Sequence, residues 1–186
     1  MKKKPFVILL TLLILIVAID FLLQANSTIT LQGFFTNDDN NYFPANQIEK
    51  EYKRYLGSKE KVVFEDSLYI VPGSSKEYVT ASASKVVAYI AAHELDFIVT
   101  TKANVLHYTK GVAFAPINEY LPLNISKEDI LYGTDGNGKY MPLAVNLKHS
   151  RFLKGTGEEE FYLFIPQTSK RKENVKPFLT WVFDQR

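Results

Sequence analysis

The sequence contains no cysteine, and this absence excludes several classes of protein at once. Without a thiol there is no disulfide framework, thiolate nucleophile, iron–sulfur cluster, cysteine-bound zinc or bacterial lipoprotein anchor. The folded part must therefore be held together by its own hydrophobic core. The 186 residues suffice for this, because a domain of about 150 residues buries roughly 68–70% of the surface that its unfolded chain exposes.

The sequence also lacks an excess of charge of either sign. It has 22 Lys and Arg residues against 20 Asp and Glu residues, and basic and acidic residues are equal in number once residues 1–23 are set aside. A neutral body offers no electrostatic attraction for nucleic acid, so we expect no nucleic-acid partner. Hydrophobic residues make up 46% of the chain, which is typical of a folded protein and excludes disorder throughout.

Sequence motifs for catalysis and metal binding are missing as well. There is no GxSxG and no phosphate loop, and the Ser-x-x-Lys spacing of Ser82 and Lys85 falls inside a predicted helix, which favours a chance match. His93 is followed by glutamate but not by the second histidine of a metalloprotease. The DGNG stretch from Asp135 has Asn146 where a calcium loop needs glutamate, so it favours a hairpin turn. We predict no catalytic residue, no metal and no cofactor.

The N-terminus has the pattern of a membrane segment. Three lysines at positions 2–4 precede the apolar run FVILLTLLILIVAI at residues 6–19, and residues 21–23 extend it beyond Asp20. Residues 6–23 approach the length of about 20 residues that spans a bilayer, and Asp20 would then lie near the outer interface. A signal peptide is the alternative, but Leu23 stands where cleavage before Asn26 requires a small residue. We therefore favour an uncleaved anchor over secretion after cleavage.

Both interpretations of the N-terminus export the rest of the chain. We divide the protein into a membrane anchor or signal segment at residues 1–25 and an extracytoplasmic α/β domain at residues 26–186. The lysines favour the cytoplasmic side. The expected location is the cell membrane, with a single pass, the N-terminus inside and the body outside.

The exported chain alternates strand and helix patterns, which indicates an α/β fold. Strands are predicted at residues 27–35, 96–100, 139–145 and 161–166, and residues 61–71 are predicted to form one long strand or two short ones around Glu65 and Asp66. Helices are predicted at residues 45–56, 74–91 and 126–131, and from residue 175 towards the end. Residues 96–100 form an apolar run typical of a strand buried on both faces, as in a parallel sheet. Pro142 confines its strand to a sheet edge or a bulge.

Two of the predicted helices have a defined apolar face. Ser74 and Glu77 match a capping box, so we expect the second helix to begin at Ser74. Its predicted inward stripe is Val79, Ala83, Val86, Val87, Ile90 and Ala91. The last helix is expected to bury Val175, Phe178, Leu179 and Val182, with Pro177 near its start.

Two stretches of the sequence resemble the type 2 extracellular solute-binding proteins of bacterial transporters. The first is ASKVVAYIAAHELDFIVTTKANVLHYTKGVAFAPINEYLP at residues 83–122, and the second is FYLFIPQTSKRKENVKPFLTWVF at residues 161–183. Leu95 to Pro122 follows the family order of an acidic residue, an apolar strand, a helix bearing tyrosine and glycine, and a Pro-Leu turn. Ile165 to Asn174 matches the pattern IPxxSKxKEN, which leads into a helix.

This resemblance implies a periplasmic-binding-protein-like fold, of which the chain has room for only one lobe. The expected fold is an open sheet with flanking helices. A ligand would bind beyond the carboxyl ends of the strands, where the loops of an open α/β sheet converge, and the resemblance implies the same edge. The candidate ligand-binding residues are Thr36, Asn37, Asp38, Thr100, Thr101 and Asn104. The alternative is that these residues only cap helices and turns.

Two function classes remain open at this point. The first is a membrane-anchored, extracytoplasmic, non-catalytic binding or interaction module that resembles a solute-binding lobe and is accessory to a transport or envelope system. Its expected partners are the membrane, through residues 6–23, a small solute or peptide, and an envelope or transporter protein. The alternative is a small envelope hydrolase whose site the sequence does not reveal.

Overall fold

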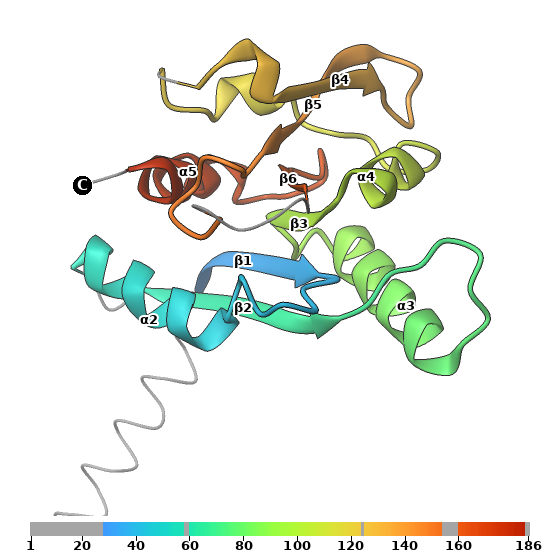
Figure 1. Cartoon of the computed structure of the whole chain (residues 1–186), viewed down its shortest axis with the longest axis horizontal. Helices are drawn as coiled ribbons and strands as arrows, with labels where there is room; N and C mark the ends of the chain where they lie inside the picture. Colours follow the sequence, from blue (N-terminus) through green and yellow to red (C-terminus); the bar gives the residue numbers. More distant parts are fainter. Residues whose placement is uncertain (1–27, 58–59, 124, 154–159, 185–186) are drawn as a thin grey trace, which may run out of the picture.

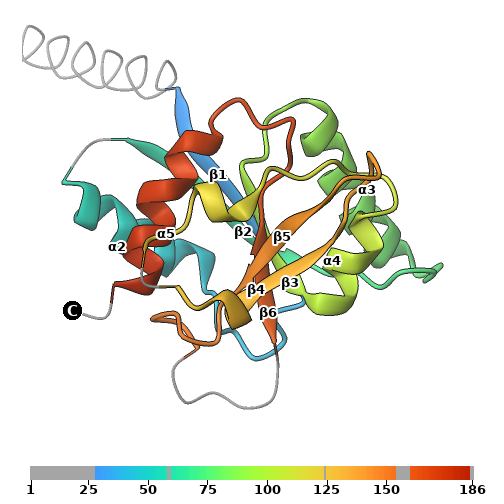
Figure 2. The same ribbon diagram turned by 90° about the horizontal axis from the view of Figure 1, so that it is seen from above.

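The computed structural model describes residues 28–57, 60–123, 125–153 and 160–184. A six-stranded sheet runs through the molecule, with helices on both faces (Figures 1 and 2). The strands are β1 (Ile29–Thr36), β2 (Lys61–Leu68), β3 (Phe97–Thr101), β4 (Ile130–Thr134), β5 (Tyr140–Asn146) and β6 (Phe161–Phe164). The α-helices are α2 (Ala45–Leu56), α3 (Glu77–Ala91), α4 (Lys102–Tyr108) and α5 (Val175–Phe183). The predicted α/β class, an open sheet with flanking helices, is confirmed.

The sheet has a parallel half and an antiparallel half. Its strand order is β2-β1-β3-β6-β5-β4, in which β1 runs parallel to β2 and β3 while the remaining neighbours are antiparallel. The middle of the sheet is therefore the pair β3 and β6, which are distant in the sequence. Gly33 in β1 provides space at this centre, since a Cβ at that position would lie 2.0 Å from Cζ of Phe97.

The strands bury side chains on both faces, and each face has its own core. Helices α2 and α5 cover one face, and α3 and α4 cover the other (Figure 2). The core under α2 and α5 includes Leu31, Phe35, Phe97, Val99, Phe161 and Leu163, and the opposite core includes Phe34, Ile98, Tyr162 and Phe164. The alternation follows from the period of two residues in a strand. The apolar run predicted to be buried on both faces is thus confirmed for β3.

Several predicted boundaries are wrong in detail. Strand β2 ends at Leu68 instead of residue 71, and α3 begins at Glu77 after Lys76 as its N-cap residue. The predicted capping box does not form, because the Ser74 hydroxyl accepts from the amide of Lys76 at 3.3 Å. The short helix predicted at residues 126–131 is a single 3-10 turn at Lys127–Asp129, and β4 follows it directly.

Other predictions hold, with one instructive exception. Pro142 pairs with Tyr132, next to a register shift between β4 and β5. This irregularity agrees with the prediction that Pro142 lies at a sheet edge or a bulge. The predicted face of α5 is buried. In α3, however, Val87 is 57% exposed and Ala91 is also exposed. The apolar stripe of α3 is therefore wider than the surface that the sheet covers.

The predicted membrane segment at residues 6–23 lies outside the described residues. Among the helices of the described ranges, none combines the length and the apolar character that a bilayer span requires.

Candidate functional site

The six candidate ligand-binding residues lie together at one edge of the sheet. Because β1 and β3 are parallel, their carboxyl ends meet at the same edge. Thr36 ends β1, Thr100 and Thr101 end β3, and Asn104 lies in the first turn of α4. Thr36, Thr100 and Asn104 are buried, with exposed fractions of 0%, 0% and 2%. The two loops that the sequence singled out thus meet at one edge of the sheet.

Hydrogen bonds within this cluster connect the two strand ends to each other. The Thr36 hydroxyl donates to Oγ1 of Thr100 at 2.7 Å, and the Asn104 amide donates to the same oxygen at 3.0 Å. The Asn104 amide also donates to Oδ1 of Asn37 at 2.9 Å and to the carbonyl of Ile70 at 3.1 Å. Asn37 in turn donates to the Ile70 carbonyl at 2.9 Å and accepts from its amide at 3.2 Å. The cluster therefore fixes the chain that follows β2.

The remaining two candidates act as local caps. Oγ1 of Thr101 accepts from the backbone amide of Asn104 at 3.4 Å and so caps α4. The Asp38 carboxylate accepts from the amides of Tyr42 and Phe43 at 2.7 and 2.6 Å and closes the loop before α2. All six side chains thus have structural roles, and a role in ligand binding stays a prediction.

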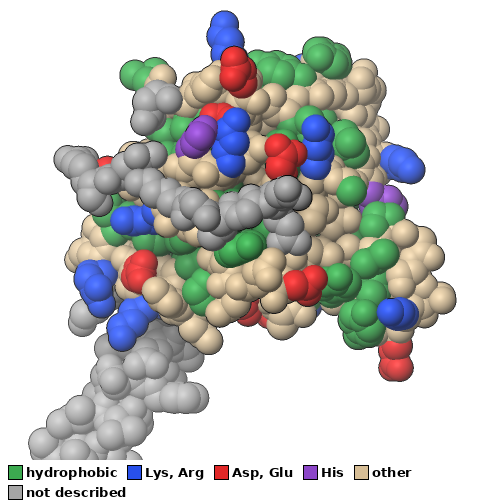
Figure 3. All heavy atoms as spheres, in the orientation of Figure 1, with side chains coloured by type: hydrophobic (Ala, Val, Ile, Leu, Met, Phe, Trp, Pro, Cys, Tyr) green, Lys and Arg blue, Asp and Glu red, His purple; other side chains and the backbone are tan. Residues whose placement is uncertain are grey.

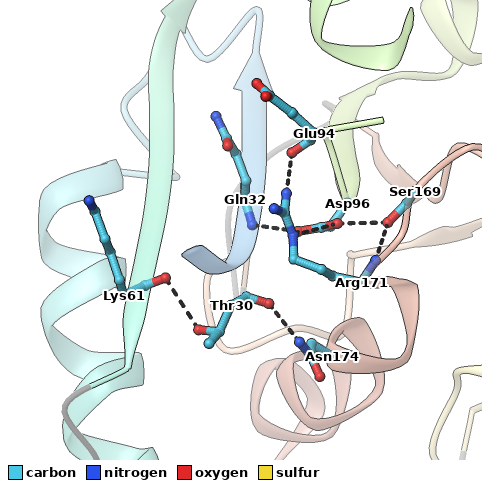
Figure 4. A network of polar contacts seen from close by, with 8 residues as sticks. All are labelled: Thr30, Gln32, Lys61, Glu94, Asp96, Ser169, Arg171 and Asn174. Atoms are coloured by element: carbon cyan, nitrogen blue, oxygen red, sulfur yellow. Dashed lines mark hydrogen bonds and ion pairs between the residues drawn. The ribbon is translucent and has the colours of Figure 1, made fainter. Parts of the chain in front are cut away.

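A second polar cluster, which sequence reasoning missed, surrounds Asp96 directly before β3 (Figure 4). Asp96 is fully buried. Its carboxylate accepts from the Gln32 amide at 2.7 Å, from the Ser169 hydroxyl at 2.6 Å and from Nε of Arg171 at 2.9 Å. Arg171 also donates to the carbonyl of Glu94. This cluster connects the segment before α5 to β1 and β3, and its groups are occupied by one another.

Ser82 and Lys85, whose spacing matches a catalytic motif in the sequence, also form contacts within the fold. Ser82 donates to the Tyr78 carbonyl at 2.9 Å, and Lys85 forms an ion pair with Glu65 at 2.7 Å. Burial alone would raise the pKa of Glu65, but hydrogen bonds from Lys85 and Ser67 hold it below its usual value. In the part of the chain that the structure describes, no three His, Asp or Glu residues are grouped as metal ligands require.

A polar pocket of about 380 Å³ lies beside the β4–β5 hairpin. It is lined by Phe114, Pro116, Glu119, Tyr120, Asp135, Asn137, Lys139, Met141, Gln167 and Lys172. Asp135 accepts from the backbone amides of Asn137 and Lys139, each at 3.0 Å. Burial opposes ionisation of Asp135, but these amides and that of Phe114 keep its pKa below the usual value. The carboxylate thus shapes the hairpin turn that the sequence predicted.

A second pocket, of about 480 Å³, lies between α3 and α4 and is largely apolar. It is lined by Val87, Ile90, Ala91, His107, Tyr108, Lys110, Gly111, Val112 and Thr168. The two residues of the predicted α3 stripe that are exposed, Val87 and Ala91, belong to this lining. Figure 3 shows hydrophobic side chains gathered over the region of α3. The signal that could have found the pocket was the excess width of the apolar stripe.

Polar groups of the α3–α4 pocket come mainly from the end of α4. Tyr108 is buried, and its hydroxyl has no hydrogen-bond partner among the described residues. Burial raises the pKa of Tyr108 well above its usual value, so this hydroxyl stays protonated. Thr168 closes one side, with its hydroxyl donating to the Ile90 carbonyl at 3.1 Å and its own carbonyl 2.8 Å from Nδ1 of His93.

Comparison of the chain with protein-family models, with curated proteins and with solved structures finds no match. What is established is therefore the class of fold, an α/β protein with a mixed six-stranded sheet. The likeness to solute-binding proteins stays a prediction.

Proposed function

We propose that this protein is a membrane-anchored, extracytoplasmic binding module without catalytic activity, similar to one lobe of a solute-binding protein. It serves a transport or envelope system by binding a small solute or peptide. The observation that carries the proposal is the apolar pocket between α3 and α4. The small envelope hydrolase remains the alternative, and it predicts a hydrolytic activity that is lost when one polar residue is replaced.

The size and lining of the pocket support a ligand of low molecular mass. Pockets for small molecules have volumes of about 300 to 1,000 Å³ and combine apolar walls with a few polar groups. The α3–α4 pocket has a volume of about 480 Å³, and its polar side chains are few. A ligand would cover Val87, which is otherwise 57% exposed. Burial of such apolar surface provides the driving force for binding.

Binding can be tested by thermal unfolding of the full-length protein in nanodiscs, which avoid detergent that would compete for an apolar pocket. The single tryptophan, Trp181, is buried and reports unfolding by fluorescence. Among small alkyl and aromatic compounds, peptides and sugars, we expect at least one to raise the melting temperature. A ligand at one hundred times its Kd stabilises the native state by about 2.7 kcal/mol.

Two phenylalanine variants of α3 and one alanine variant locate the site. Ala91→Phe fills the α3–α4 pocket and is expected to abolish the shift. Ala81→Phe is the control, because Ala81 is exposed on the same helix and does not line the pocket. Loss of the shift in Asn37→Ala, with retention in Ala91→Phe, would instead place the ligand at the sheet edge predicted from the sequence. A screen without any shift would contradict a binding function for small molecules.

The anchored topology predicts that external protease degrades residues 26–186 on intact cells. The lysines at positions 2–4 should keep the N-terminus inside, and residues 6–23 should span the bilayer. Immunoblotting of cells with and without protease measures this, with a cytoplasmic protein as the control for cell integrity. Protection of the body, or a mature protein in the medium that begins near Asn26, would show that the topology is wrong.

A further inference from the structure

We infer that the α3–α4 pocket binds a small carboxylate with an apolar body, such as an alkyl or aryl carboxylic acid. This inference rests on the proposed binding function and specifies its ligand class. Its first element is the apolar wall formed by Val87, Ile90, Ala91 and Val112. Such a wall accommodates the hydrocarbon part of a ligand and provides no partners for hydroxyl groups along its length.

The second element is the charge of the lining. Lys110 and His107 are the basic side chains of the lining. No aspartate or glutamate occurs among the residues that line the pocket in the described part of the chain. Lys110 also forms no ion pair within that part. An anionic head group is therefore the complement of this lining.

The helix ends near the pocket disfavour an anion, because the carboxyl end of a helix carries a partial negative charge. Both α3 and α4 end at the pocket, and the carboxyl end of a helix favours a cation. However, the last carbonyls of these helices are hydrogen-bonded within the chain. Those of Tyr89 and Ile90 accept from the amides of Glu94 and His93, and that of Tyr108 accepts from the amide of Val112. These carbonyls therefore present less partial negative charge to the pocket than free helix ends would.

Three probes with the same body and different head groups test the inference: hexanoate, hexan-1-ol and hexylammonium. We expect hexanoate to bind most tightly and hexylammonium most weakly to the full-length protein in nanodiscs. The measurement is the chemical shift of the Ile and Val methyl groups in NMR titrations, corrected for partition of each probe into empty nanodiscs. Equal affinities for the three probes, or tighter binding of hexylammonium, would overturn the carboxylate assignment while leaving the binding function intact.

Variants of α4 and the residues after it separate charge from shape. Lys110→Gln should weaken hexanoate by up to about fivefold, the upper range for an ion pair with an exposed lysine, and should leave hexan-1-ol unchanged. Lys102→Gln is the control, since Lys102 is exposed at the start of α4 and does not line the pocket. An unchanged hexanoate affinity in Lys110→Gln would contradict the inference.

The presence or absence of saturable probe binding distinguishes failure of the inference from failure of the proposed function. If none of the three probes binds, the pocket does not accept a small amphiphile, and a protein or membrane surface would be its occupant. The inference then fails. The proposed function fails only if the wider screen of peptides, sugars and aromatic compounds also yields no ligand.

Discussion

Replacing Asp96 by alanine is expected to destabilise the protein by about 3 to 5 kcal/mol, the cost of removing one partner from a buried ion pair. Arg171, which is only 24% exposed, would lose its carboxylate partner. The Gln32 amide and the Ser169 hydroxyl would lose their acceptor as well. Since domains are stable by only about 5 to 15 kcal/mol, the variant should unfold at much lower urea concentration. Urea titration monitored by Trp181 fluorescence measures the change.

Two further variants control this experiment. Asp96→Asn keeps an acceptor for the Gln32 amide but loses the charge, so its destabilisation should be intermediate. Glu49→Ala breaks the ion pair with Lys53, 2.6 Å long, on the surface of α2. Such a pair contributes less than about 1 kcal/mol. If Asp96→Ala and Glu49→Ala lower the midpoint equally, the cluster around Asp96 does not stabilise the fold.

Replacing Phe178 by alanine should also cost about 3 to 5 kcal/mol, the range for truncation of a buried aromatic side chain. Phe178 is 1% exposed and connects α5 to the sheet. Its ring stacks on that of Phe97, with centroids 4.7 Å apart, and meets the ring of Tyr52 edge-on at 5.1 Å. The truncation would leave a cavity beside the rings of Phe97 and Tyr52. The same urea titration measures the loss.

The matched control for this variant is Thr180→Ala on the same helix. Thr180 is exposed, and its hydroxyl donates only to the Lys176 carbonyl one turn earlier, at 2.9 Å. A surface change of this kind should alter stability by no more than about 0.5 kcal/mol. A small effect of Phe178→Ala, comparable with that of Thr180→Ala, would show that α5 does not contribute its aromatic face to the core.

The elements whose pattern is local were predictable from the sequence. Residues 96–100 are apolar without interruption because β3 is covered on both faces. The spacing of Val175, Phe178, Leu179 and Val182 places them on one helical face, and all four are buried. The clustering of Thr36 and Thr100 followed from the rule that parallel strands end at a common edge. Each of these inferences needed only short-range periodicity or one rule of topology.

What the sequence did not predict depends on contacts between distant residues. The partners of Asp96 are 64, 73 and 75 residues away along the chain, and no local pattern connects them. Ser74 illustrates a competition at short range, since its hydroxyl bonds to the nearer Lys76 amide and so does not cap the helix. Val87 shows that helical periodicity predicts an apolar face but not how much of that face the sheet covers.

The position of β6 has a consequence for the order in which the protein can be completed. This strand comes from residues 161–164, yet it lies between β3 and β5 in the middle of the sheet. During synthesis from the N-terminus, the apolar strand β3 can pair with β1 long before β6 exists. Its other side would remain an open edge, the kind of surface on which chains aggregate. A chain that lacks residues from 161 onwards would thus expose the unpaired edge of β3. Protection of this edge from aggregation therefore depends on the strand that is synthesised last.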